Sequence, residues 1–227
     1  MKFTPKTEAE LAEIVAGLQA PVKLQGGGTR AIGHSIAQDV LDMSGISGVV
    51  DYEPGALTLV AKAGTPMAEI EALLAAEKQR LSFEPMDHRT LLGTQGAPTI
   101  GGAVAANVSG PRRISVGACR DFALGVRFVD GMGRALKNGG RVMKNVTGYD
   151  LVKLMAGSWG TLGAMSEVSL KVMPCPEAEA TLALHVADAP VAVEAMSAAL
   201  GSPYEVTGAA QNGPVYLRIE GFAPSVA

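Results

Sequence analysis

The sequence predicts an α+β fold in which two lobes are followed by a smaller C-terminal unit, and three observations support this prediction. Two glycine-rich segments, Gly26–Thr29 and Thr99–Asn107, each lie beside an apolar segment of strand-like composition. Strand-like segments between residues 122 and 173 are joined by glycine-containing turns, which is typical of a hairpin-rich sheet. Past Pro176 the periodicities follow a β-α-β-β order, about half of a ferredoxin-like unit.

The first lobe is expected to span residues 1–88. A helix is predicted from Thr7, where the spacing to Glu10 suits a capping box, to Leu18, with apolar residues at helical spacing. A short strand at 22–25 runs into the first glycine-rich segment, and a second helix opens at 64–66. Further short strands are predicted at residues 40–43, 48–52 and 57–61.

Residues 89–176 form the expected second lobe, and residues 177–227 form a partial C-terminal cap. In the second lobe a strand at 122–130 turns into a short strand at 134–137, and a further strand at 164–173 ends before Pro174. Residues 150–156 resemble one or two helical turns. The cap would contain strands at 180–186, 205–210 and 215–220 and a helix at 190–200. Because so small a sheet rarely forms an independent domain, we expect the cap to be part of a longer protein.

The composition excludes several classes of function. The 227 residues are 48% hydrophobic, which is enough for a substantial core. Nineteen basic and 22 acidic residues give a net charge of −3 without basic clusters, so nucleic acid is not expected as a partner. The two cysteines and three histidines are too scattered for a metal site or an iron–sulfur cluster within the chain. No apolar stretch approaches the ~20 residues of a transmembrane helix, and no secretory signal is visible, so we expect a cytoplasmic protein with no transmembrane segment.

The two glycine-rich segments indicate where a ligand binds. Glycine lets a ligand approach the main chain, and consecutive amides in such a loop can hold a phosphate. One such loop is equally well explained as a tight turn, but two suggest an extended ligand whose diphosphate lies between the lobes. No Lys-Ser/Thr follows Gly26–Thr29 as in a nucleoside-triphosphatase loop, and Gly131–Gly133 lacks the third glycine of a nicotinamide-binding unit.

Together with the residues that follow it, the second segment resembles the FAD-binding domain of the p-cresol methylhydroxylase (PCMH) and vanillyl-alcohol oxidase (VAO) type. The resemblance covers residues 21–174, with its elements in the family's order. It rests on Gly26–Thr29, Thr99–Gly102, Asn107–Gly110, Gly117, Arg120–Asp121, Gly125, Lys144–Leu151, Gly157–Gly163 and Glu167. Within the family, Ser109–Arg113, Val142–Val146 and Trp159 look most similar to the smaller FAD-binding subunit of bacterial glycolate oxidase. The larger flavin subunit usually has an acidic residue at the position of Trp159.

The resemblance implies that FAD is the cofactor and that it binds at the junction of the lobes. Backbone amides of Gly26–Thr29 and Ile100–Gly102 would donate to the diphosphate, and the ADP half would lie between the lobes. The expected cofactor-binding residues are Gly26, Gly27, Gly28, Thr29, Thr99, Ile100, Gly101, Gly102, Asn107, Gly110, Gly117, Asp121, Val126 and Glu167. No catalytic residue and no metal ligand is identified.

Two departures from the family predict that FAD is bound noncovalently. Members that attach flavin through a histidine place it near the first glycine loop, where this chain has Thr29. Members that add a cysteinyl link place the cysteine near the position of Ala97.

The roles of several neighbouring residues stay open from sequence. Arg112 and Arg113 could hold a substrate carboxylate, contact a flavin phosphate or form a salt bridge with a partner chain. His34 could lie near the flavin or be a surface or packed histidine, and His88 could be a hinge residue between the lobes. Cys119 is most simply a buried small apolar residue.

The resemblance implies a subunit of an FAD-dependent oxidoreductase that takes part in oxidising glycolate, a small 2-hydroxy acid, to glyoxylate. The implied partners are a homologous FAD-binding subunit, which could itself oxidise the substrate, and an iron–sulfur subunit. Such a hetero-oligomer is expected in the cytoplasm, or peripheral to the inner membrane through its partners. The alternatives are a stand-alone FAD-dependent 2-hydroxy-acid dehydrogenase and a flavin-binding assembly subunit without turnover.

Overall fold

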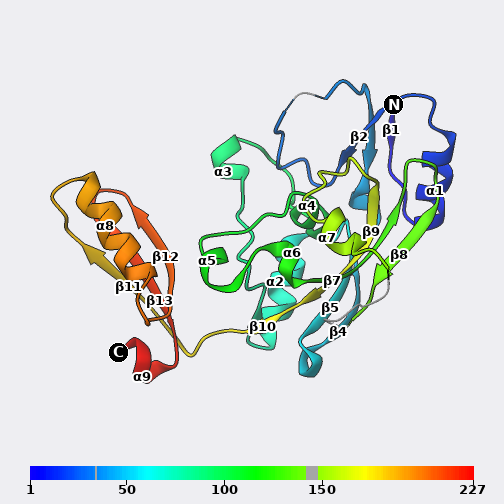
Figure 1. The fold of residues 1–227 in the computed structure, drawn as a ribbon. Helices are drawn as coiled ribbons and strands as arrows, with labels where there is room; N and C mark the ends of the chain where they lie inside the picture. The colour runs from blue at the N-terminus through cyan, green and yellow to red at the C-terminus, as the bar shows by residue number, and fades with distance from the viewer. Residues whose placement is uncertain (34, 142–147) are drawn as a thin grey trace.

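The computed structural model describes residues 1–33, 35–141 and 148–227. His34 and the Val142–Thr147 part of the family motif lie outside the described residues. The chain forms a body of two sheets with their helices, and a small C-terminal unit that stands to one side of it (Figure 1). The mixture of sheets and helices confirms the predicted α+β class.

The smaller sheet of the body is parallel, with the order β1-β3-β2. Its strands are β1 (Lys2–Phe3), β2 (Val22–Gln25) and β3 (Asp39–Asp42). Helix α1 (Glu8–Gly17) joins β1 to β2 and begins as predicted, because the Thr7 hydroxyl accepts a hydrogen bond from the backbone amide of Glu10 (3.1 Å). The Glu10 carboxylate reaches back to the amide of Lys6 rather than of Thr7, so the capping box is displaced by one residue.

The larger sheet has five antiparallel strands in the order β4-β5-β9-β7-β8. These strands are β4 (Val49–Glu53), β5 (Thr58–Lys62), β7 (Ala123–Val129), β8 (Ala135–Gly139) and β9 (Ala164–Lys171). The expected boundary at residue 88 does not divide this sheet into two lobes, because β9 pairs with β5 on one side and with β7 on the other. Strands from both sides of that boundary therefore share one core.

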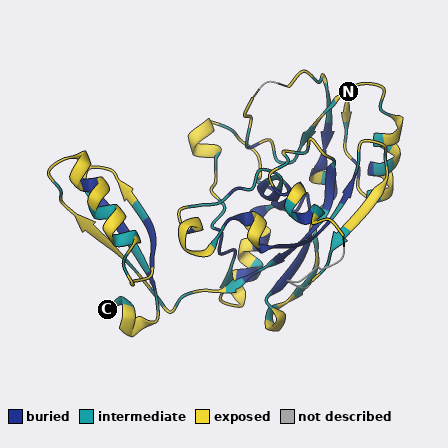
Figure 2. Ribbon diagram, viewed as in Figure 1, coloured by how far each residue is buried: buried dark blue, intermediate teal, exposed yellow. Residues whose placement is uncertain are grey.

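Helices cover one face of the larger sheet and form the main core of the protein (Figure 2). They are α2 (Met67–Ala76), α4 (Ile100–Ala105), α6 (Cys119–Phe122) and α7 (Leu151–Met155). Ile70 and Leu74 of α2 pack with Leu59 and Leu170 of the sheet, all four at most 1% exposed. The remaining short elements are η1 (Met43–Gly45), η2 (Pro54–Ala56), α3 (Arg89–Leu92), α5 (Arg113–Val116) and the paired strands β6 (Gln79–Arg80) and β10 (Met173–Pro174).

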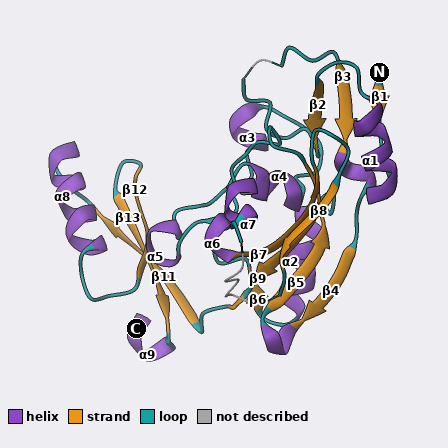
Figure 3. Ribbon diagram, turned by 45° about the vertical axis from the view of Figure 1, so that its right-hand side comes forward, coloured by secondary structure: helices purple, strands orange, loops and turns teal. Residues whose placement is uncertain are grey.

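The C-terminal unit has the predicted β-α-β-β order. It consists of β11 (Ala178–Leu184), α8 (Ala189–Leu200), β12 (Val206–Gln211) and β13 (Val215–Gly221), followed by α9 (Ala223–Val226). Its antiparallel sheet has the order β11-β13-β12, and α8 lies along one face (Figure 3). Only Ala192, Val215 and Leu217 form its buried apolar cluster, so the unit has a small core of its own.

Candidate functional site: a glycine-lined cleft between the sheets

An open cleft lies where the end of β2 meets the start of α4, and its empty space of about 900 Å³ includes solvent at its mouth. The cleft is lined by the first glycine-rich segment and by the start of the second, with the loop before β9 completing the wall. Its lining residues are Lys23–Ala31, Met43, Ala63, Thr99, Gly101, Gly102, Ala105, Ala106, Trp159, Gly160, Gly163 and Met165.

The two glycine-rich segments contact each other directly. A Cβ atom at Gly27 would lie 1.6 Å from the carbonyl oxygen of Ala97, and one at Gly26 would lie 2.4 Å from the Thr99 hydroxyl oxygen. The Thr94 hydroxyl also donates a hydrogen bond to the carbonyl oxygen of Thr29 (2.8 Å). Glycine is therefore required at positions 26 and 27 so that two loops about 70 residues apart in sequence can touch.

The amides at the start of α4 are already used within the protein, which corrects the expected source of diphosphate donors. Ile100 N–H donates to the carbonyl oxygen of Thr65 (3.0 Å), and Gly101 N–H donates to that of Ala63 (2.8 Å). Gly102 N–H donates to the hydroxyl of the N-cap residue Thr99 (3.3 Å). The second segment thus anchors α4 to the end of β5 rather than offering three free donors.

The first segment supplies the available donors. Within the described part of the chain, the amides of Gly27, Gly28 and Thr29 have no hydrogen-bond partner. Gly28 has a φ of +70°, which turns the loop in a way that favours glycine. Successive unpaired amides in such a turn form a concavity suited to an anion.

Arg30 adds a positive charge to the cleft, and sequence reasoning missed it. Its guanidinium lies close to the glycine pair of α4, because a Cβ at Gly102 would be 3.5 Å from Arg30 Nη1. Arg30 Nε donates to His88 Nδ1 (3.2 Å), so His88 orients this side chain. Burial lowers the pKa of the guanidinium, although an arginine stays charged in proteins. A half-buried guanidinium beside a glycine-rich loop is suited to a phosphate.

The other expected site residues lie away from this lining. Ile100 and Val126 are buried in the main core. Glu167 pairs across the sheet with Lys62 of β5 and Arg127 of β7.

A neighbouring loop cluster contains four more of the expected residues, Asn107, Gly110, Gly117 and Asp121. Asn107 Oδ1 accepts a hydrogen bond from the amide of Arg120 (2.8 Å), and Asp121 Oδ2 accepts one from the amide of Ala118 (2.8 Å). Their assignment to the cofactor stays a prediction.

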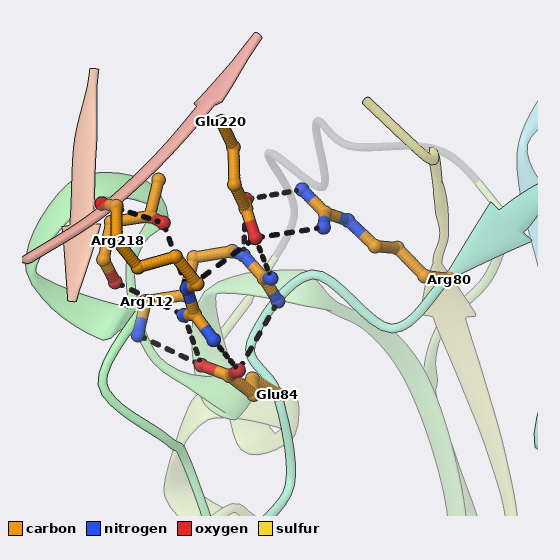
Figure 4. Close-up of polar contacts among 6 residues, drawn as sticks. Arg80, Glu84, Arg112, Arg218 and Glu220 are labelled. Atoms are coloured by element: carbon orange, nitrogen blue, oxygen red, sulfur yellow. Dashed lines mark hydrogen bonds and ion pairs between the residues drawn. The ribbon is translucent and has the colours of Figure 1, made fainter. Parts of the chain in front are cut away.

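Arg112 belongs to a network that attaches the C-terminal unit to the body (Figure 4). Its Nε donates to Glu220 Oε2 (2.9 Å), and Arg80 Nη2 donates to the same oxygen (2.9 Å). Glu84 accepts from the Arg112 amide (3.0 Å) and from Arg218 Nη2 (2.9 Å). The three roles considered for Arg112 are therefore corrected: its side chain binds carboxylates of its own chain.

Across the described ranges, no group of three His, Cys, Asp or Glu side chains is arranged to hold a metal ion. In the same residues, no helix is long and apolar enough to cross a lipid bilayer.

The cleft, its free amides and its arginine are suited to the diphosphate of a dinucleotide, which places the chain in the class of dinucleotide-binding proteins. Residues 1–139 match the family described as the FAD binding domain, and the chain belongs to this family. Membership confirms FAD as the cofactor. The solved structure of an alkyldihydroxyacetonephosphate synthase shares the fold, with a TM-score of 0.78 and 19% identity over 99% of this chain and 48% of that one.

Curated relatives include subunits of glycolate oxidase and a D-2-hydroxyglutarate dehydrogenase. The chain is 38% identical to glycolate oxidase subunit GlcE of Escherichia coli over 213 residues, 92% of this chain and 58% of that protein. It is 28% identical to glycolate oxidase subunit GlcD of Bacillus subtilis, over 79% of this chain and 38% of that protein. It is 33% identical to a D-2-hydroxyglutarate dehydrogenase of Xanthomonas citri over 66% of this chain and 31% of that protein. The chain thus spans between 31% and 58% of the length of these relatives.

Proposed function

We propose that this chain is the FAD-binding subunit of a glycolate oxidase or dehydrogenase complex that oxidises glycolate to glyoxylate. The similarity to GlcE along 92% of the chain is the observation that carries this proposal. The similarity to GlcD supports a homologous flavin subunit as the partner. An iron–sulfur subunit is proposed as the electron acceptor, with the complex in the cytoplasm or peripheral to the inner membrane.

Residues of the first glycine-rich segment would hold the cofactor. The amides of Gly27, Gly28 and Thr29 would donate to the diphosphate, and Arg30 would neutralise part of its charge. When bound, FAD supplies the two-electron chemistry that 2-hydroxy-acid oxidation requires. Thr29 and Ala97 stand where covalently linked family members have their attachment residues, which supports noncovalent binding.

The cleft lining supports an accessory role for this chain. Among the described residues that line the cleft there is no Asp, Glu or His. These side chains most often abstract a substrate proton, and Lys23 is the one side chain of the described lining that could also act as a base. We therefore assign substrate oxidation to the homologous partner subunit, while this chain binds FAD and supports assembly or electron relay.

A second candidate is a stand-alone FAD-dependent 2-hydroxy-acid dehydrogenase. The 33% identity to a D-2-hydroxyglutarate dehydrogenase and to a D-lactate dehydrogenase of Anaerostipes hadrus favours it. Under this candidate the substrate pocket would be completed by residues beyond those in this chain. A flavin-binding assembly subunit with no turnover would have the same cleft, but a substrate would not reduce its flavin.

Absorbance spectroscopy separates these candidates. The purified chain should show a flavin spectrum, and acid precipitation should release all colour to the supernatant. Under anaerobic conditions glycolate should bleach the flavin only when the larger flavin subunit is co-purified with this chain. Bleaching of the isolated chain by D-lactate or D-2-hydroxyglutarate would establish the stand-alone enzyme, and a chain that neither contains nor binds FAD would refute the proposal.

A further inference from the structure

Trp159 lines the cleft in an unusual backbone conformation. Its φ is +54°, in the left-handed region that bulky residues rarely adopt, and its side chain is 51% exposed. It is the single tryptophan of the chain. A strained and exposed large aromatic residue at a ligand cleft requires a physical explanation, since both features cost free energy in the unliganded protein.

The backbone around Trp159 fixes its position. The Trp159 amide donates to the carbonyl oxygen of Ala105 at the end of α4 (2.8 Å). Gly157 and Gly160 on either side have φ values of +91° and +75°. A Cβ at Gly160 would lie 3.2 Å from Leu24 Cδ2, so the loop is packed against β2. The backbone at Trp159 is therefore held by a hydrogen bond to α4 and by packing of Gly160 against the Leu24 side chain, and not by burial of the indole ring.

Trp159 is also the one aromatic residue among the described residues that line the cleft. The apolar lining is otherwise aliphatic or thioether, including Leu24, Met43 and Met165. FAD carries two planar ring systems, the isoalloxazine and the adenine. An exposed indole at the cleft offers a flat apolar face to such a ring, and stacking would remove both surfaces from water.

We propose that the indole of Trp159 stacks on a planar ring of the FAD bound in this cleft. This proposal rests on FAD binding by the chain. It adds Trp159 to the cofactor site, a role that the family motif alone does not give to this residue. The free energy gained by stacking offsets the free-energy cost of the strained backbone and of the exposed ring. This explains the presence of a tryptophan at this backbone position.

Affinity measurements on four variants test the stacking. Trp159→Ala and Trp159→Asn both remove the ring, and asparagine tolerates positive φ, so the Asn variant keeps the loop conformation without the indole. Both should weaken FAD binding by about tenfold to a hundredfold in titration calorimetry. Trp159→Phe keeps an aromatic face and should stay within about threefold of the wild type. The matched control Tyr149→Ala removes an aromatic side chain that is 88% exposed and lies outside the lining, and it should leave the affinity unchanged.

Titration with the two halves of the cofactor identifies the ring. If the adenine stacks on Trp159, the Ala and Asn variants lose affinity for ADP, and if the isoalloxazine does, they lose affinity for FMN. The near-ultraviolet circular dichroism of the single tryptophan should change when the relevant half binds to the wild type.

The outcomes distinguish this inference from the proposed function. Wild-type affinity for FAD in both the Ala and the Asn variants would overturn the stacking while leaving the FAD site intact. A Phe variant as weak as the Ala variant would also overturn it, because stacking tolerates another aromatic ring. A wild-type chain that binds no FAD would refute the proposed function together with the stacking.

Discussion

Arg112 and Glu220 form a buried ion pair that joins the body of the protein to the C-terminal unit. The two side chains come from positions 108 residues apart and contact each other through two hydrogen bonds. Arg112 is 5% exposed and Glu220 is 3% exposed. Arg80 and Glu84 of the body add further ion pairs to Glu220 and Arg218 of the C-terminal unit. Breaking a buried pair by removing one partner leaves an uncompensated charge.

Removal of the Glu220 carboxylate should destabilise this attachment. Glu220→Gln leaves Arg112 and Arg80 without their shared acceptor charge, and we expect a loss of roughly 3–5 kcal/mol in the free energy of unfolding. Urea titration measures this loss, and a glutamate-specific protease should cut the connection between β10 and β11, after Glu177, faster in the variant. The control Glu194→Gln changes an exposed carboxylate on α8 and should stay within about 0.5 kcal/mol of the wild type. Equal stability of both variants would show that the ion pair does not hold the unit.

The same carboxylate should make the attachment sensitive to acid. Burial alone raises the pKa of Glu220, but hydrogen bonds from Arg112 and Arg80 outweigh it and bring the pKa from 4.5 to about 2. A carboxyl group whose pKa is lowered by folding stabilises the folded protein. This stabilisation is fully present above the pKa of the group in the unfolded chain, and it is lost as the pH falls through the pKa in the folded protein. The difference in melting temperature between wild type and Glu220→Gln should therefore be constant above about pH 5 and shrink between pH 4.5 and 2. A difference that does not vary with pH would contradict this assignment.

Gly27→Ala should separate the two glycine-rich loops. The new methyl group would lie 1.6 Å from the Ala97 carbonyl oxygen, so one loop must move. We expect a cost of roughly 1–3 kcal/mol in stability and loss of FAD binding, measured by thermal unfolding and flavin titration. Gly17→Ala is the matched control, since nothing lies within 4 Å of its Cβ position in the last turn of α1. That control should be neutral or stabilising, by up to about 1 kcal/mol. Full FAD binding by Gly27→Ala would contradict a role for this loop contact.

Arg30 should contribute to FAD affinity mainly through charge. Arg30→Ala should weaken binding by about tenfold to a hundredfold, as expected when a charge-assisted hydrogen bond worth about 1.5–3 kcal/mol is lost. Arg30→Lys keeps the charge and should bind more tightly than Arg30→Ala. Calorimetry with FAD and with ADP measures these affinities, and riboflavin, which lacks phosphate, should bind all three proteins alike. The control Arg113→Ala removes an exposed guanidinium outside the cleft lining. A riboflavin affinity that falls with that of FAD would argue against a phosphate contact.

The two cysteines should differ in reactivity. Burial raises the pKa of the Cys119 thiol to about 12, so little thiolate exists at neutral pH, whereas Cys175 is exposed. A thiol reagent should modify one cysteine per folded chain and both after denaturation in urea. Mass spectrometry of the folded sample should locate the modification at Cys175, and modification at Cys119 would show that the core opens there.

Much of the fold was predictable from local patterns. The strand predicted at 215–220 is observed as Val215–Gly221, and the helix predicted at 190–200 is observed as Ala189–Leu200, because each contains regular periodicity bounded by turn residues. The pairing of β6 with β10 was not predictable, since two-residue strands carry no periodic signal. The sheet that crosses residue 88 was also missed, because strand neighbours are chosen by contacts distant in sequence.

The sequence by itself determined the family, the cofactor and the first glycine loop, since these depend on residue types in a fixed order. Only the tertiary structure decided which donors are free, because the amides of Ile100 and Gly101 are satisfied by the end of β5 and the following loop. It also decided that Arg112 binds Glu220 and that Arg30 and Trp159 reach the cleft. The physical reason is that hydrogen bonds and ion pairs form between groups that are close in space. A buried polar group needs such a partner, and the partner can lie far away in the sequence.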